Sequence, residues 1–216
     1  MLPRSWPRSW ASSLNHSPSL QIIRKASFSA APWKNGGGIT YEAMRVPAGG
    51  DSFRWRLSVA HIDVSGPFSD FAAYNRKMVL LRGSGLKLEF ADGQQTALRH
   101  MGDLAEFDGA VATRCELLNG PCIDLNLIVS KSMRAEVRVE RVSESFQIPG
   151  AQFESALIFS LEDPLLLTGD AGETQTLEPW DLAVLAQCGA RISKLPPANL
   201  AAPSAVFFAT ISNRYE

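Results

Sequence analysis

The segment Val79–Leu98, VLLRGSGLKLEFADGQQTAL, has a counterpart later in the chain that indicates how the whole sequence folds. The segment Ile158–Leu177, IFSLEDPLLLTGDAGETQTL, aligns with it without a gap, so that leucines and a turn glycine coincide. A second block, Asp103–Ala105, matches Asp181–Ala183 one residue out of register. Two successive blocks in the same order favour an internal duplication over a chance likeness between two β-hairpins.

Strand patterns also dominate the rest of the chain. Phe53–Ala60 and Leu86–Phe90 alternate apolar and polar side chains, and no stretch has a convincing helical period. Further short β-rich runs lie between Gly, Pro and Asp turns: Arg114–Leu118, Asp124–Val129, Glu136–Val142, Leu165–Thr168 and Ala205–Ile211. Many short strands separated by turns predict an all-β sandwich or barrel. A hairpin, a Gly-Asp turn and an apolar strand are also how the small barrels called cupins are built.

The duplication predicts two related β-sandwich modules in one compact unit, the first over residues 20–130 and the second over residues 131–216. The last strand of the second module is apolar on both faces, so we expect that module to be mainly structural. Residues 1–19 are rich in Ser, Pro and Arg, and the first acidic residue of the chain is Glu42. We expect a disordered N-terminal tail, with an organelle transit segment as the alternative.

Composition excludes several classes of protein. With 216 residues, 45% hydrophobic content and a net charge of −1, the chain fits one globular unit and has no basic footprint for nucleic acid. No apolar run is long enough to cross a bilayer. The three cysteines, Cys115, Cys122 and Cys188, form no CxxC pair, which favours a reducing compartment.

The sequence offers no clear catalytic or metal-binding motif. His61 and His100 stand apart from one another and do not form the HxH pair of metal-using cupins. Isolated histidines are more often surface or core residues than ligands, so we expect no metal and no cofactor. No nucleophile with a neighbouring base can be read from the sequence, and no catalytic residue is assigned.

A glycine triplet marks a second region of interest, in the stretch Ala31–Glu42, APWKNGGGITYE. Glycine reaches positive φ without steric penalty, so Gly36–Gly38 predict a tight turn, with a flexible loop between strands as the alternative. Lys34 and Asn35 next to the turn supply a cation and an amide.

Five blocks in order resemble the HutD/Ves family: Pro32–Thr40 (PWKNGGGIT), Phe53–Ile62 (FRWRLSVAHI), Gly66–Phe71 (GPFSDF), Leu80–Phe90 (LLRGSGLKLEF) and Gly120–Val129 (GPCIDLNLIV). The resemblance runs from about residue 20 to 130 and weakens after that. It implies a bacterial, cytoplasmic double cupin of two RmlC-like jelly-roll barrels, without an established enzymatic activity. The HutD branch is encoded with histidine-degradation genes and is thought to sense or buffer an intermediate such as N-formylglutamate or urocanate. The Ves branch is associated with stress, and the sequence does not choose between the two.

Strand alternation predicts where a ligand would bind. Arg56 lies on the face of its strand opposite Trp55, and Asp124 and Asn126 lie opposite Leu125. In a generic sheet such polar faces meet water, whereas in a cupin barrel they line the interior. The predicted ligand-binding set comprises Trp33, Lys34, Asn35, Gly36, Gly37, Gly38, Arg56, Asp124 and Asn126.

Each polar member of this set has an expected role. We expect Arg56 to bind a carboxylate through two hydrogen bonds and Lys34 to add a second cation. Asn35 or Asn126 would read an amide or formyl group, and Asp124 would orient an arginine or accept a ligand N–H. Arg76 is expected to hold the loop that begins at Gly66 rather than to contact a ligand.

Three kinds of function remain open at this point. The first is a non-catalytic binder of a small polar carboxylate. The second is a metal-independent isomerase or hydrolase, which requires His61 or Asp124 to face the pocket with a perturbed pKa. The third is a protein-interaction module, which requires an exposed Trp33 and no enclosed cavity. A homodimer is a further option.

Overall fold

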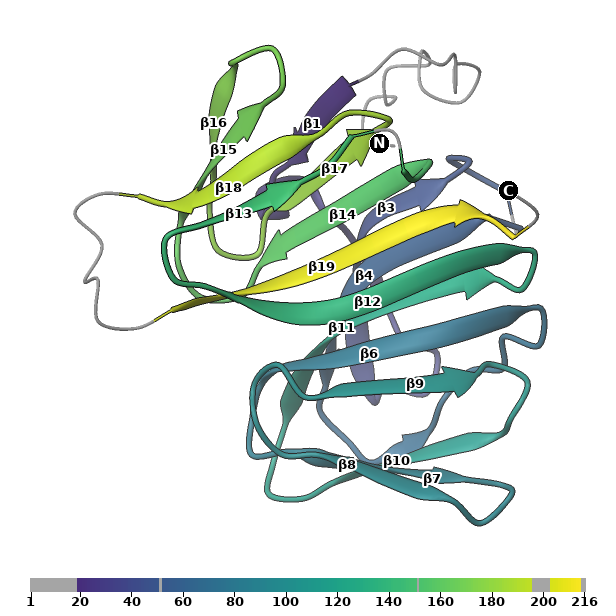
Figure 1. The fold of residues 1–216 in the computed structure, drawn as a ribbon. Coiled ribbons are helices and arrows are strands. Elements are labelled where there is room, and N and C mark those ends of the chain that lie inside the picture. Colours follow the sequence, from purple (N-terminus) through teal and green to yellow (C-terminus); the bar gives the residue numbers. More distant parts are fainter. Residues whose placement is uncertain (1–18, 51, 151, 196–202, 215–216) are drawn as a thin grey trace, which may run out of the picture.

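The computed structural model describes residues 19–50, 52–150, 152–195 and 203–214, and these form four stacked β-sheets (Figure 1). Apart from Ser19, the predicted N-terminal tail lies outside the described residues. The prediction of an all-β protein is confirmed, because the only helix among the described residues is the 3-10 turn η1 (Lys25–Ser27).

The first barrel consists of two antiparallel sheets. The six-stranded sheet has the order β2 (Ser29–Pro32), β3 (Gly38–Val46), β4 (Trp55–Ile62), β11 (Cys122–Ser130), β6 (Tyr74–Arg82) and β9 (Leu104–Asp108). The four-stranded sheet has the order β5 (Gly66–Pro67), β10 (Thr113–Leu117), β7 (Leu86–Phe90) and β8 (Gln95–Leu98). Side chains from both sheets, among them Met78, Leu88 and Cys115, share one apolar core.

The second barrel repeats this plan. Its five-stranded sheet has the order β1 (Ser19–Ile23), β17 (Leu182–Ala186), β14 (Ser155–Ser160), β19 (Ser204–Asn213) and β12 (Met133–Val142). Its four-stranded sheet has the order β13 (Ser145–Ile148), β18 (Ala190–Lys194), β15 (Leu165–Gly169) and β16 (Thr174–Leu177). The repeated segments occupy corresponding places, since β7 pairs with β8 and β10 just as β15 pairs with β16 and β18.

The two large sheets pack face to face and form the core between the barrels. Trp55, Leu57 and Val59 of β4 and Phe159 and Phe207 of the second barrel belong to this core and are at most 3% exposed. Because side chains alternate along a strand, the residues between them on β4 face the interior of the first barrel. The apolar face of β4 therefore anchors the interface while its polar face is free to form a site.

The first strand among the described residues belongs to the sheet of the second barrel. β1 pairs with β17 in antiparallel register, with Ile22 opposite Ala183, whereas β2 joins the first barrel. The division into modules at residues 20–130 and 131–216 stays a prediction. β1 lies in the first of these segments but pairs with β17 in the second.

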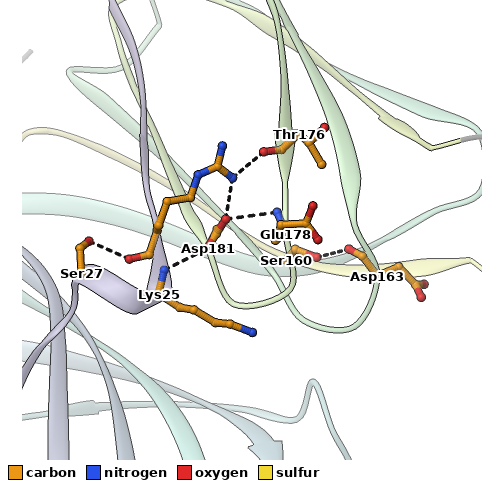
Figure 2. Close-up of polar contacts among 8 residues, drawn as sticks. Lys25, Ser27, Ser160, Asp163, Thr176, Glu178 and Asp181 are labelled. Carbon is orange, nitrogen blue, oxygen red and sulfur yellow. Dashed lines mark hydrogen bonds and ion pairs between the residues drawn. The ribbon is translucent and has the colours of Figure 1, made fainter.

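A buried carboxylate fastens the segment between β1 and β2 to the second barrel (Figure 2). Asp181 is 1% exposed and accepts hydrogen bonds from the backbone N–H of Lys25 at 2.8 Å and from Nη1 of Arg24 at 2.7 Å. It also accepts a longer bond of 3.3 Å from the N–H of Glu178, and Arg24 donates to the carbonyl of Thr176 as well. We call these contacts the Asp181 latch.

Replacing Asp181 with alanine is expected to lower the free energy of unfolding by roughly 3 kcal/mol, because hydrogen bonds to a charged group contribute about 1.5–3 kcal/mol each and do not add fully. Arg24→Ala is the control and should cost less than about 1 kcal/mol, since the Arg24 side chain is 47% exposed. Urea unfolding measures both values. Equal losses in the two variants would show that the latch depends on the ion pair rather than on the buried acceptor.

Candidate binding site

A cavity of about 630 Å³ opens in the first barrel on the polar face of its six-stranded sheet. Its walls come from β3, β4, β6 and β11, from the loop after β2 and from the loop after β5. Six of the predicted site residues line it: Trp33, Lys34, Asn35, Arg56, Asp124 and Asn126. The structure thus brings together residues from three distant parts of the sequence.

The three glycines shape the turn beside the cavity without lining it. The turn closes through hydrogen bonds from the Trp33 N–H to the Gly38 carbonyl and from the Gly36 N–H to the Trp33 carbonyl. Gly36 has a φ of +70°, and the Gly37 N–H is bound by Oδ1 of Asn35 at 3.1 Å. A Cβ on Gly38 would lie 2.2 Å from the carbonyl oxygen of His61. The triplet therefore forms the tight turn that the sequence predicted, and the structure shows that this turn packs closely against β4.

Gly38→Ala is expected to destabilise the protein by about 3 kcal/mol, the upper part of the range for overpacking, because the obstacle is backbone. Gly36→Ala is the matched control, since nothing lies within 4 Å of its added Cβ and only the positive φ is strained. That variant should lose about 1–2 kcal/mol. Thermal and urea unfolding of both proteins give the comparison, and a smaller loss for Gly38→Ala would contradict the close approach.

Arg56 reaches the cavity from β4 with its guanidinium held between two aromatic rings. Its Cζ lies 5.4 Å from the ring centroid of Phe53 and 5.2 Å from that of Phe71. Burial lowers the pKa of Arg56, and its Nε has no hydrogen-bond partner. Within the described ranges no carboxylate lies within ion-pair distance of Arg56, whereas nearby Glu42 is engaged by Arg45 through bonds of 2.9 and 2.6 Å.

Arg76 is a second arginine in the cavity, and the sequence did not assign it there. It is 6% exposed, and its guanidinium lies among the rings of Phe68, Phe71 and Phe107 at 4.8, 5.6 and 5.0 Å. Its Nε donates a 3.4 Å hydrogen bond to Oδ1 of Asn126, and burial lowers its pKa to about 10. Arg76 contacts the loop after Gly66, the predicted role, and it also lines the cavity.

Asp124 is a buried acidic group that lines the cavity. It is 0% exposed, and its Oδ2 accepts a hydrogen bond of 3.1 Å from Nδ2 of Asn126, while its Oδ1 has no partner. Burial raises the pKa of Asp124 to about 7. Asp124 and Arg56 do not form an ion pair with one another, since their charged atoms are more than 4.0 Å apart. Both groups are therefore available to a ligand.

The two histidines among the described residues, His61 and His100, lie away from this cavity. His61 packs on Tyr41 with ring centroids 5.1 Å apart and does not line the cavity, and His100 sits at an exposed turn beside Asp103. In the part of the chain that the structure describes, no group of three or more His, Cys, Asp or Glu side chains could hold a metal ion. Over the same residues no helix is long and apolar enough to cross a membrane.

Trp33 forms part of the cavity wall rather than a free anchor. It is half-buried, its indole Nε1 donates to Oγ1 of Thr40 at 2.8 Å, and its ring meets Phe68 edge-on with centroids 6.3 Å apart. An interaction module would need this ring exposed and the barrel filled. The geometry instead combines cations, an amide and a protonatable acid around one hollow, which suits a small anionic ligand.

Two barrels of this topology, fused in one chain, define the class as a double cupin. In agreement, the oxalate decarboxylase of Lactobacillus farciminis, solved as a formate complex, has a TM-score of 0.65 over 89% of this chain and 88% of that chain. At 7% identity this likeness concerns the fold alone.

The chain belongs to the HutD family, whose model matches residues 25–201, and this confirms the resemblance seen in the sequence. The solved structure of HutD from Pseudomonas fluorescens has a TM-score of 0.75 and 27% identity, covering 91% of this chain and all of that one. A Pseudomonas putida protein described as an uncharacterised 21.2 kDa protein in the hutC 3′ region is 44% identical over 110 residues. That alignment covers 50% of this chain and 57% of the relative.

Proposed function

We propose that the cavity of the first barrel binds a small metabolite that carries at least one carboxylate. The observation that supports this most directly is the presence of two guanidinium groups in the cavity, that of Arg76 buried and that of Arg56 half-buried, with no carboxylate within ion-pair distance among the described residues. A buried charge without a partner costs free energy, and a bound carboxylate would recover that cost. Arg56 offers the fork of donors that a carboxylate binds with two parallel hydrogen bonds.

The expected affinity is moderate. A hydrogen bond to a charged group contributes about 1.5–3 kcal/mol. Two guanidinium contacts with a carboxylate, together with Asn126 or Lys34 on a second polar group, would give a dissociation constant in the micromolar range, roughly −8 kcal/mol. Such an affinity suits a protein that responds to metabolite concentration.

The physiological role we propose is to sense or buffer an intermediate of histidine degradation. The P. putida relative from the hutC 3′ region and the HutD fold support this context. N-formylglutamate and urocanate are the first candidates, because each combines a carboxylate with further hydrogen-bonding groups.

A thermal-shift screen of the full chain tests this function with histidine, urocanate, N-formylglutamate, glutamate, formate and simple dicarboxylates. At about 100 times its dissociation constant a ligand adds roughly 2.7 kcal/mol, which should raise the midpoint by about 5 °C or more. Arg114→Gln, a change on the exposed face of β10, is the control and should respond like the wild type. Unchanged midpoints with every carboxylate would reject the proposed function.

A second candidate function is a metal-independent enzyme acting on the same kind of ligand. The observation in its favour is Asp124, which faces the cavity and whose pKa is raised to about 7, near the value that suits a general acid or base. NMR spectra of each binding metabolite, incubated with stoichiometric protein, test this candidate. Turnover that Asp124→Asn abolishes without loss of binding supports the enzyme, and unchanged spectra support the binder.

A further inference from the structure

Asp124 has one carboxyl oxygen, Oδ1, that is buried and makes no hydrogen bond. The residue is 0% exposed and lines the cavity, and its other oxygen is already bound by Asn126. A buried acceptor without a donor is costly when the group is ionised, because nothing replaces the lost hydration. Protonation turns this oxygen into a hydroxyl group, which can donate a hydrogen bond to a ligand oxygen in the cavity.

Charged and titratable groups reach Asp124 from all the strands packed around it. Arg76 of β6 favours the ionised carboxylate, and Arg56 of β4 lies close enough to Arg76 to disfavour its charge. The thiols of Cys115 on β10 and Cys122 on β11 have raised pKa values and stay neutral near pH 7. Glu42 of β3 acts on Arg56, and its carboxylate is bound by Arg45.

The charge balance of the cavity therefore depends on Asp124. Lys34, Arg45, Arg56 and Arg76 line the cavity together with Glu42 and Asp124, so the formal net charge of the lining is +2 with Asp124 ionised and +3 with Asp124 protonated. A carboxylate that enters beside Arg56 and Arg76 competes with ionised Asp124 for the same cations. Like charges that share one site raise the pKa of one partner, so the buried carboxyl takes the proton.

We infer that a carboxylate ligand binds together with one proton, which Asp124 holds and donates from its unpartnered oxygen to an oxygen of the ligand. This inference rests on the proposed carboxylate-binding function. It makes Asp124 a specificity residue, because the protonated carboxyl donates a hydrogen bond at this position and therefore selects a ligand oxygen over a ligand N–H.

The sign of the pH dependence follows from linkage. The free protein releases the proton of Asp124 near pH 7, and the bound anion moves this pKa higher. Below pH 7 the proton is already present, so the dissociation constant is nearly flat. Above pH 7 each binding event must take up a proton, so the dissociation constant rises up to about tenfold per pH unit.

Formate is a suitable probe, since it stays fully ionised across this range. Its dissociation constant, measured by 1H–15N NMR titration of the full chain at pH 6, 7, 8 and 9 and constant ionic strength, should rise at least 30-fold from pH 6 to pH 9. Asp124→Asn places a permanent donor in the same position, so that its dissociation constant should change less than threefold. Asp92→Asn, which removes an exposed carboxylate in the β7–β8 turn, should keep the wild-type pH slope.

The outcomes separate the two claims. Formate binding with a flat pH profile in the wild type overturns the proton-linked inference. A pH slope in Asp124→Asn equal to that of the wild type overturns it as well. Both outcomes leave the proposed function standing. No formate binding at any pH overturns the inference, and the proposed function falls with it only when every other carboxylate of the thermal-shift screen also fails to bind. The wild-type slope remains a test on its own if Asp124→Asn fails to fold.

Discussion

Replacing Arg56 with glutamine is expected to weaken the binding of a carboxylate about 100-fold or more. The variant loses a charge and the planar fork of donors, and each charge-assisted hydrogen bond contributes about 1.5–3 kcal/mol. Two such bonds, which do not add fully, correspond to roughly two or three decades of affinity. The dissociation constants of formate and N-formylglutamate, measured by titration of both proteins, provide the comparison.

Arg56→Lys separates charge from geometry. Lysine keeps the charge but not the fork, so it should recover only part of the lost affinity. Arg114→Gln should bind like the wild type, because that side chain is exposed on β10. If Arg56→Gln weakens binding less than threefold, the carboxylate does not lie against this guanidinium.

Asp124→Asn is expected to make the protein more stable than the wild type at pH 8. In the unfolded chain an Asp side chain releases its proton near pH 3.9, whereas the folded protein holds it up to a pKa of about 7. Between these values the folded state binds more protons, so wild-type stability falls as the pH rises, and it levels off above pH 7. Three pKa units correspond to at most about 4 kcal/mol.

The asparagine variant lacks this loss, because its side chain does not ionise. Urea unfolding of both proteins at pH 5, 6, 7 and 8 gives the difference in their free energies of unfolding. The other titrating groups are the same in both proteins, so their contributions cancel in this difference. The advantage of the variant should grow from pH 5 to pH 7 and then stay constant. A difference that does not vary with pH would show that Asp124 titrates normally in the folded state.

Much of this site could be predicted from the sequence, because the side chains of two of its strands alternate between apolar and polar. β4 and β11 each place one face in the core between the barrels and one in the first barrel, so a period of two assigns Arg56, Asp124 and Asn126 to a common side. The glycine triplet likewise predicted a tight turn from local conformational preference alone, whereas its contact with β4 is visible only in the structure.

Arg76 lies beyond the reach of such a pattern. β6 is flanked by β11 and β9 and is buried on both faces from Arg76 to Leu81, so its sequence does not alternate. An arginine in that context reads as a residue that supports a loop, and only the three-dimensional arrangement shows that its guanidinium also reaches the cavity. His61 follows the alternation of β4, since it lies on the same face as Trp55, Leu57 and Val59 and packs on Tyr41 outside the cavity.

Long-range pairing was also hidden from the sequence. Arg24 and Asp181 are 157 residues apart, and no local signal connects a charged residue after one strand with an acid before another. The apolar residues of β1 are equally compatible with a place in the first barrel, which lies next to them in the chain.

The position of β1 has a consequence for how the protein is made. β1 is the first described strand to leave the ribosome, and its partner β17 is among the last. At about 5–20 residues per second, the interval lasts roughly 10–30 s. During that time Ile22 and Ile23 lack the strand that covers them, although the first barrel can already close. The strands of the first barrel are therefore all synthesised before the second barrel is complete, whereas β1 has to wait for β17 before it can pair.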